Sequence, residues 1–87
     1  MALSNQVFNK FYDVSASDSL DLELFRTRGL LTSGIYVGTA GDVAAVSQDG
    51  TAVIFDGVPA GTTLNIAVRR INSTGTAASD ILALYVV

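Results

Sequence analysis

The 87-residue chain is long enough for one domain but too short for a second hydrophobic core. It contains no cysteine and no histidine, which excludes disulfides, cysteine-based zinc or iron–sulfur centres, thiol nucleophiles and imidazole catalysis. Its net charge of −3 argues against nucleic acid and anionic membranes as binding partners.

A domain this small buries a limited share of its surface, so its stability as a monomer is marginal. Without disulfides or cysteine-bound metals, oligomerisation is the remaining means of stabilising it. The hydrophobic fraction of 49% agrees, because so small a body has little interior for that much apolar surface. No apolar run approaches the roughly 20 residues that cross a bilayer, and the N-terminal stretch lacks a signal-peptide pattern. We therefore expect a homo-oligomer that is not secreted and has no membrane partner.

The chain is expected to divide into an N-terminal arm, residues 1–13, and a single β domain, residues 14–87. Phe8, Phe11 and Tyr12 lie in the arm among polar residues. Two explanations remain open. The arm folds back and covers an edge of the domain, or it docks on a neighbouring chain with the aromatic rings as anchors.

Period-two alternation of apolar and polar residues recurs along the chain and is interrupted by turn residues about every 8–12 positions. This pattern predicts an all-β fold, a small antiparallel β-sandwich or barrel of six to eight short strands. The clearest strands are expected at residues 19–24, 30–37, 42–47, 51–58, 62–71 and 79–87. The second of them is interrupted at Ser33-Gly34.

Turn residues separate the predicted strands. Asp49-Gly50 between two alternating runs predicts a hairpin, because glycine adopts a positive φ without a Cβ clash. Pro59 and Gly61 predict the next turn, in which the proline ring presets its own φ.

Two glycines three positions apart, Gly38 and Gly41, raise the question of a phosphate-binding loop. Such a loop needs a helix after it, whose N-terminus holds the anion. Here an alternating strand pattern follows, no lysine comes after the glycines, and Asp42 would repel an anion. We therefore interpret the stretch as a turn between strands and expect no bound cofactor.

The last two predicted strands bear on assembly. In the fifth, the apolar positions change parity at Arg69-Arg70, which indicates a bulge or the end of the buried stretch. These arginines either form salt bridges to another subunit or end a solvated strand. Residues 81–87 are apolar throughout, which implies burial on both faces. Either another subunit covers the second face, or the strand is central and the N-terminal segment covers it.

Four acids, Asp13, Asp18, Asp21 and Glu23, lie close together in the sequence. They lack the regular spacing, central glycine and closing glutamate of an EF-hand calcium loop. A glycosidase needs two carboxylates that face each other across a cleft, which so small a domain hardly offers. We expect a solvated strand face with turn-capping aspartates, and no metal site or catalytic residue.

Several short motifs, in order, resemble a known family. They are YVGTAGDV (36–43), FDGVPAGT (55–62), VRRI (68–71), TGTA (74–77) and DILALY (80–85). This ordered set resembles the small spike-base proteins of phage-like gene transfer agents and of many tailed phages and prophages, over about residues 28–86. The resemblance implies a non-enzymatic virion component that forms oligomers on the capsid exterior and holds a fibre or decorates the shell.

We therefore expect a structural protein of a phage virion, a head spike base or a capsid decoration (cement) protein made in the bacterial host cytoplasm. Its expected partners are its own copies, as a trimer or pentamer, the major capsid protein and a spike fibre protein. The alternative function is a small carbohydrate-binding β-module. The expected interface residues are Phe8, Phe11, Tyr12, Arg69, Arg70, Tyr85 and Val87. The expected turn residues are Gly38, Gly41, Asp49, Gly50, Pro59 and Gly61.

Overall fold

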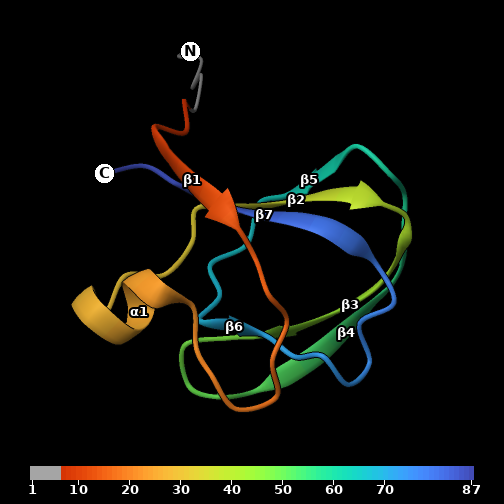
Figure 1. The fold of residues 1–87 in the computed structure, drawn as a ribbon, viewed down its shortest axis with the longest axis horizontal. Coiled ribbons are helices and arrows are strands. Elements are labelled where there is room, and N and C mark those ends of the chain that lie inside the picture. The colour runs from red at the N-terminus through yellow and green to blue at the C-terminus, as the bar shows by residue number, and fades with distance from the viewer. Residues whose placement is uncertain (1–6) are drawn as a thin grey trace.

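The computed structural model describes residues 7–87, which fold into two antiparallel sheets and one short helix (Figure 1). The first sheet has the strand order β1-β7-β2-β5, and the second has the order β4-β3-β6. The elements are β1 (Lys10–Asp13), α1 (Glu23–Arg28), β2 (Gly34–Thr39), β3 (Gly41–Val46), β4 (Ala52–Val58), β5 (Thr62–Leu64), β6 (Arg70–Ile71) and β7 (Ser79–Tyr85). The predicted all-β class is confirmed.

The stretch with two glycines carries the chain from one sheet to the other. β2 ends at Thr39 in the first sheet, and β3 begins at Gly41 in the second. A Cβ atom on Gly38 would lie 2.8 Å from the Cβ and carbonyl oxygen of Asp80, and one on Gly41 would lie 2.5 Å from the backbone nitrogen of Ala78. Only glycine fits these two close approaches to the chain around β7.

The predicted hairpin at Asp49-Gly50 joins β3 and β4, which agree with the strands predicted at 42–47 and 51–58. The register between them shifts between Gly41 and Val43, as in a β-bulge. Next to this bulge, the Gly57 amide donates to Asp42 Oδ1 (2.7 Å). Asp42, which follows the two glycines in the sequence, therefore holds the end of β4.

The strand predicted at 19–24 is wrong, because the chain forms α1 at Glu23–Arg28 instead. Gly29 ends the helix with φ of 68°, and its amide donates to the carbonyl of Phe25. Glu23 lies in the first turn and Arg26 in the last, which is the charge order that the helix dipole favours. Leu22 and Leu24 both point into the core, so alternation of leucines alone did not distinguish strand from helix.

The strand predicted at 62–71 is two strands, β5 and β6, which lie in different sheets. Residues 65–69 cross between the sheets, and the parity change at Arg69-Arg70 coincides with the start of β6. The buried Thr32 holds this crossing, since its Oγ1 donates to the carbonyl of Ile66 (2.8 Å) and accepts from the amide of Val68 (3.0 Å). The strand predicted from residue 30 therefore begins only at Gly34.

β7 is a central strand, paired with β1 on one side and β2 on the other. Its burial alternates: Ile81, Ala83 and Tyr85 are buried, whereas Leu82 and Leu84 are half-buried. The expectation of full burial on both faces is thus met on one face only. Residues 10–13, which were expected to lie in the arm, form β1 and pair with the edge of β7.

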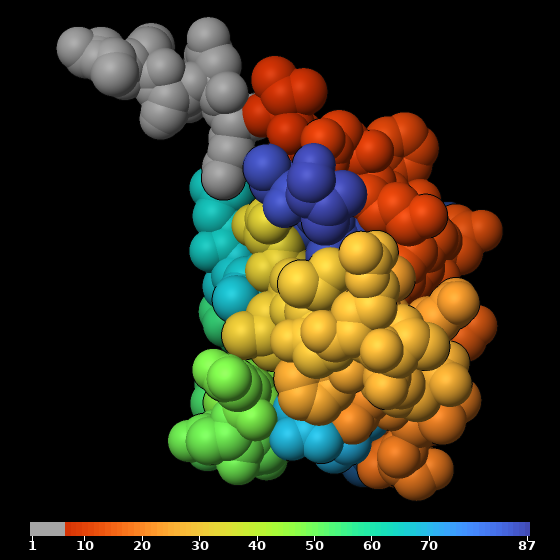
Figure 2. All heavy atoms as spheres, turned by 90° about the vertical axis from the view of Figure 1, so that its left-hand side faces the viewer, coloured from red at the N-terminus to blue at the C-terminus, as the bar shows by residue number. Residues whose placement is uncertain are grey.

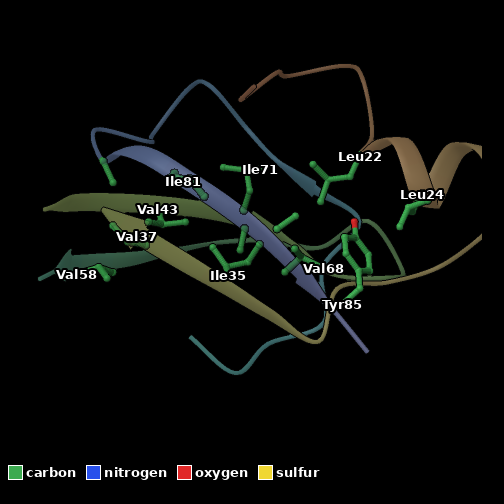
Figure 3. Close-up of a cluster of buried hydrophobic side chains, with 13 residues drawn as sticks. Leu22, Leu24, Ile35, Val37, Val43, Val58, Val68, Ile71, Ile81 and Tyr85 are labelled. Atoms are coloured by element: carbon green, nitrogen blue, oxygen red, sulfur yellow. The ribbon is translucent and has the colours of Figure 1, made fainter. Parts of the chain in front are cut away.

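The core lies between the two sheets (Figure 3). Both sheets contribute small aliphatic side chains, and the residues around α1 contribute leucines. Its members are Leu22, Leu24, Ile35, Val37, Val43, Ala45, Val58, Val68, Ile71, Ala78, Ile81, Ala83 and Tyr85. Among the described residues, no helix is long and apolar enough to cross a membrane.

Candidate interaction surfaces

The structure separates the seven predicted interface residues into three groups. Phe11 and Val87 are the most exposed, each at 61%. Tyr85 is 1% exposed and belongs to the chain's own core. The remaining four are half-buried: Phe8, Tyr12, Arg69 and Arg70.

Tyr85 forms a stacked pair with Tyr12, which lies on the neighbouring strand β1 of the same sheet. The ring centroids lie 5.5 Å apart, and the two hydroxyl oxygens are hydrogen-bonded at 2.8 Å. The amide of Leu24 also donates to the Tyr12 hydroxyl (3.3 Å), so the pair ties the start of α1 to the first sheet. Burial raises the pKa of the Tyr85 hydroxyl well above its usual range, and the Tyr12 hydrogen bond adds to this shift. Tyr85 therefore contributes to the fold of its own chain.

Arg69 and Arg70 share one acid within the chain. Arg69 Nη2 lies 2.8 Å from Asp21 Oδ2, and Arg70 Nη1 lies 2.8 Å from Asp21 Oδ1. The Arg69 guanidinium also lies over the Phe25 ring, 4.5 Å from its centroid. The hydrogen bond from Arg69 holds the pKa of Asp21 below its usual range. The two arginines thus fasten β6 to the segment before α1.

A first exposed apolar patch, here called the terminal patch, consists of Val7, Phe11, Val86 and Val87. The side chain of Asn9 holds it together, because Asn9 Nδ2 donates to the carbonyl of Val87 (2.7 Å) and Asn9 Oδ1 accepts from its amide (2.8 Å). In Figure 2 the red residues around β1 and the blue C-terminal residues lie against each other.

A second exposed apolar feature lies on β4, an edge strand of its sheet. Val53 is 53% exposed and Ile54 is 50% exposed. Sequence reasoning missed both residues as candidates. The signal was present, because Val53, Ile54 and Phe55 are consecutive apolar residues in a strand with only one face available to the core.

A shallow apolar groove runs along the inner side of β4, where the sandwich is open. Its volume is about 260 Å³. Val53 and Phe55 form one wall, and the crossing residues Ile66 to Val68 form the other. Ser47 and Thr51 supply hydroxyl groups at the end near the β3–β4 turn. We call this feature the β4 groove.

Of the four acids grouped in the sequence, Asp18 and Asp21 have specific partners. Asp18 accepts hydrogen bonds from the amide and hydroxyl of Thr74, which hold its pKa below the usual value. Asp13, Asp21 and Glu23 line a second hollow of about 270 Å³. Within residues 7–87, no three potential ligands are arranged to hold a metal ion.

Asp49 supplies a test by pH. Its Oδ1 accepts from the Ser47 hydroxyl (2.7 Å) and the Thr51 amide (3.0 Å), and these bonds lower its pKa from 3.8 to about 2. The ionised carboxylate therefore stabilises the fold. This stabilisation is fully present at pH values above the pKa of Asp49 in the unfolded chain, and it is lost as the pH falls through the folded-state pKa of about 2. We expect Asp49→Asn, which keeps an acceptor but does not titrate, to flatten the fall in unfolding free energy across this range. Urea unfolding at several pH values measures it, and an unchanged pH dependence contradicts this role.

No protein-family model matches the chain, and no curated protein sequence matches it. A solved structure does match: a chain in the "Capsid of native GTA particle computed with C5 symmetry", which is the capsid of a gene transfer agent. The TM-score is 0.77 and the identity is 26%, over 95% of this chain and 90% of the other. With the sandwich fold, this similarity supports a phage-like, capsid-associated protein.

Proposed function

We propose that the chain is a non-enzymatic structural protein of a phage-like virion, bound to the outside of the capsid as a head spike base or a decoration protein. The observation that carries this proposal is the match to a capsid chain over 95% of the length. A match of this extent includes both sheets, the crossing segment and the loops.

The chemistry of the described residues supports the same function. Asp18, Asp21 and Asp49 use their carboxylates to hold turns and arginines of their own chain. These three carboxylates make structural contacts, which fits a structural protein.

The exposed apolar surfaces support assembly. The terminal patch and the β4 groove leave several valines and a phenylalanine in contact with water on a chain of 87 residues. Apolar surface of this kind is typical of proteins that bind partners. The partners we propose are copies of the same chain and the major capsid protein, together with a spike fibre if the chain is a spike base.

The aromatic side chains do not favour the alternative of a carbohydrate-binding module. Such a module stacks sugars on exposed rings, but Tyr12 and Tyr85 stack on each other within the chain. Phe11 is a single exposed ring on a narrow edge strand, which is too little for a stacking platform.

Particles assembled with and without the chain test the proposal. We expect particles from cells that lack the gene to bind the purified protein when it is added back, without entry into the shell. Gold-labelled protein on intact particles, viewed by electron microscopy, measures this. The control is bovine serum albumin carrying the same gold label. Binding to glycans on an array without binding to particles would favour the carbohydrate-binding module instead.

A further inference from the structure

Among residues 7–87, four strand edges have no partner strand, and two of them, those of β1 and β4, lie on opposite flanks of the molecule. β1 and β5 are the two edges of the first sheet, and β4 is an edge of the second. Residues 59–61 connect β4 directly to β5, so β4 lies on the flank opposite β1. Figure 2 shows this arrangement, with red β1 residues on one flank and green-to-cyan residues on the other.

The side chains of the two edges match each other. On β1, Tyr12 points to the core, so Phe11 points to the opposite face and is exposed. On β4, Val53 and Phe55 face the groove, so Asp56 points away from it. Lys10 and Asp56 are both exposed, and neither forms an ion pair with another described residue.

We propose that β1 of one copy pairs antiparallel with β4 of a second copy, with Phe11 opposite Phe55 and Lys10 opposite Asp56. Residues directly opposite in such a pair lie on the same side of the sheet. The Phe11 ring then lies over the β4 groove of the next copy, against Phe55 and Ile66. On the other side of the sheet, the Lys10 ammonium meets the Asp56 carboxylate.

The remaining pairs in this register are compatible with it. Asp13 comes opposite Val53, beside the end of the groove that carries the Thr51 hydroxyl. A shift by one residue puts Phe11 opposite Ile54 and Lys10 opposite Phe55, which loses both the apolar and the charge match. A parallel arrangement that keeps Phe11 beside the apolar residues of β4 moves Asp13 toward Asp56, where two negative charges repel.

The two edges are different surfaces on opposite flanks, so each copy uses one edge to bind the copy before it and the other to bind the copy after it. This head-to-tail contact closes into a ring when the rotation angle that relates neighbouring copies is a whole-number fraction of 360°. This interface depends on the self-association that the proposed function includes. Beyond that function, it names the two surfaces through which the copies bind each other.

Cysteine cross-linking tests this register directly, because the natural chain contains no cysteine. Opposite residues of an antiparallel pair approach closely enough for a disulfide. We expect the chain with Lys10→Cys and Asp56→Cys to give a ladder of oxidised oligomers that ends at the closed ring. Each single-cysteine variant should stay unlinked. The matched control is Lys10→Cys with Ile54→Cys, which changes two exposed positions but lies two residues out of register.

The outcomes separate this interface from the proposed function. Equal ladders from the control pair, or dimers from Lys10→Cys alone, overturn the proposed register. Phe11→Ala should weaken association about thirtyfold, as for an aromatic anchor in an interface. If the wild-type chain is oligomeric or bound to particles and the double-cysteine chain gives no ladder, the interface is wrong and the proposed function stands. If the wild-type chain is monomeric and absent from particles, both fail.

Discussion

Gly41→Ala is expected to lower the free energy of unfolding by about 3 kcal/mol. The new methyl group would lie 2.5 Å from the Ala78 nitrogen and 2.8 Å from the Ala77 carbonyl carbon, and both are backbone atoms. They cannot move aside as the end of a flexible side chain can, so the two sheets must separate at this corner. A domain of this size has about 4–13 kcal/mol of total stability, so the loss is a large part of it.

Thermal unfolding followed by circular dichroism measures this effect, with an expected fall in Tm of more than about 12 °C. Gly50→Ala is the matched control, because Gly50 also has a positive φ but has no atom within 4 Å of the added methyl group. Its expected cost is the backbone strain alone, about 1–2 kcal/mol. Equal losses of unfolding free energy in the two variants would contradict this account. They would show that the positive φ alone, and not the close approach to Ala77 and Ala78, requires glycine at position 41.

The second large effect is expected at Tyr85, where Tyr85→Ala should cost about 3–5 kcal/mol. The ring is buried beside the leucines of the α1 region and stacks on Tyr12, so its removal leaves a cavity that the rigid sheets cannot close. Tyr85→Phe keeps the ring and removes only the hydroxyl that bonds to Tyr12, at a cost of about 1 kcal/mol.

Chemical denaturation of both Tyr85 variants measures these costs. If Tyr85→Ala unfolded like wild type but failed to assemble, the residue would belong to a subunit interface, as its place in an apolar terminal strand first indicated. The structure predicts the opposite result: Tyr85→Ala loses much of its stability, and Tyr85→Phe, which keeps the ring, loses little stability and assembles like wild type.

The sequence predicted those strands in which alternation and turn residues agree. β3 and β4 are the clearest case, because Asp49-Gly50 fixes their hairpin and both flanking runs alternate. The same reasoning failed at residues 19–24. Three leucines at every second position fit a strand, and Gly29 was the one local signal that a short helix ends there.

Long-range contacts account for the remaining errors. The sequence around residues 62–71 contains no signal that Thr32 binds the backbone of residues 66–68. This contact divides the predicted fifth strand between two sheets. Likewise, the charge of Arg69 and Arg70 marked them as interface candidates, but their partner Asp21 lies 48 residues before Arg69. Phe11 was predicted from its place in a polar arm and Val87 from the apolar C-terminal run, whereas Val53 and Ile54 became candidates only when β4 proved to be an edge strand.

A cryo-electron microscopy reconstruction of intact particles that carry the chain tests the central claim most directly. The account predicts density for the two-sheet domain on the outer surface of the capsid, repeated around a symmetry axis with β1 of each copy beside β4 of the next. Five-fold spike bases correspond to about 60 copies per particle and a decoration protein to several hundred. Particles in which the chain is absent, or present only inside the shell, would contradict it.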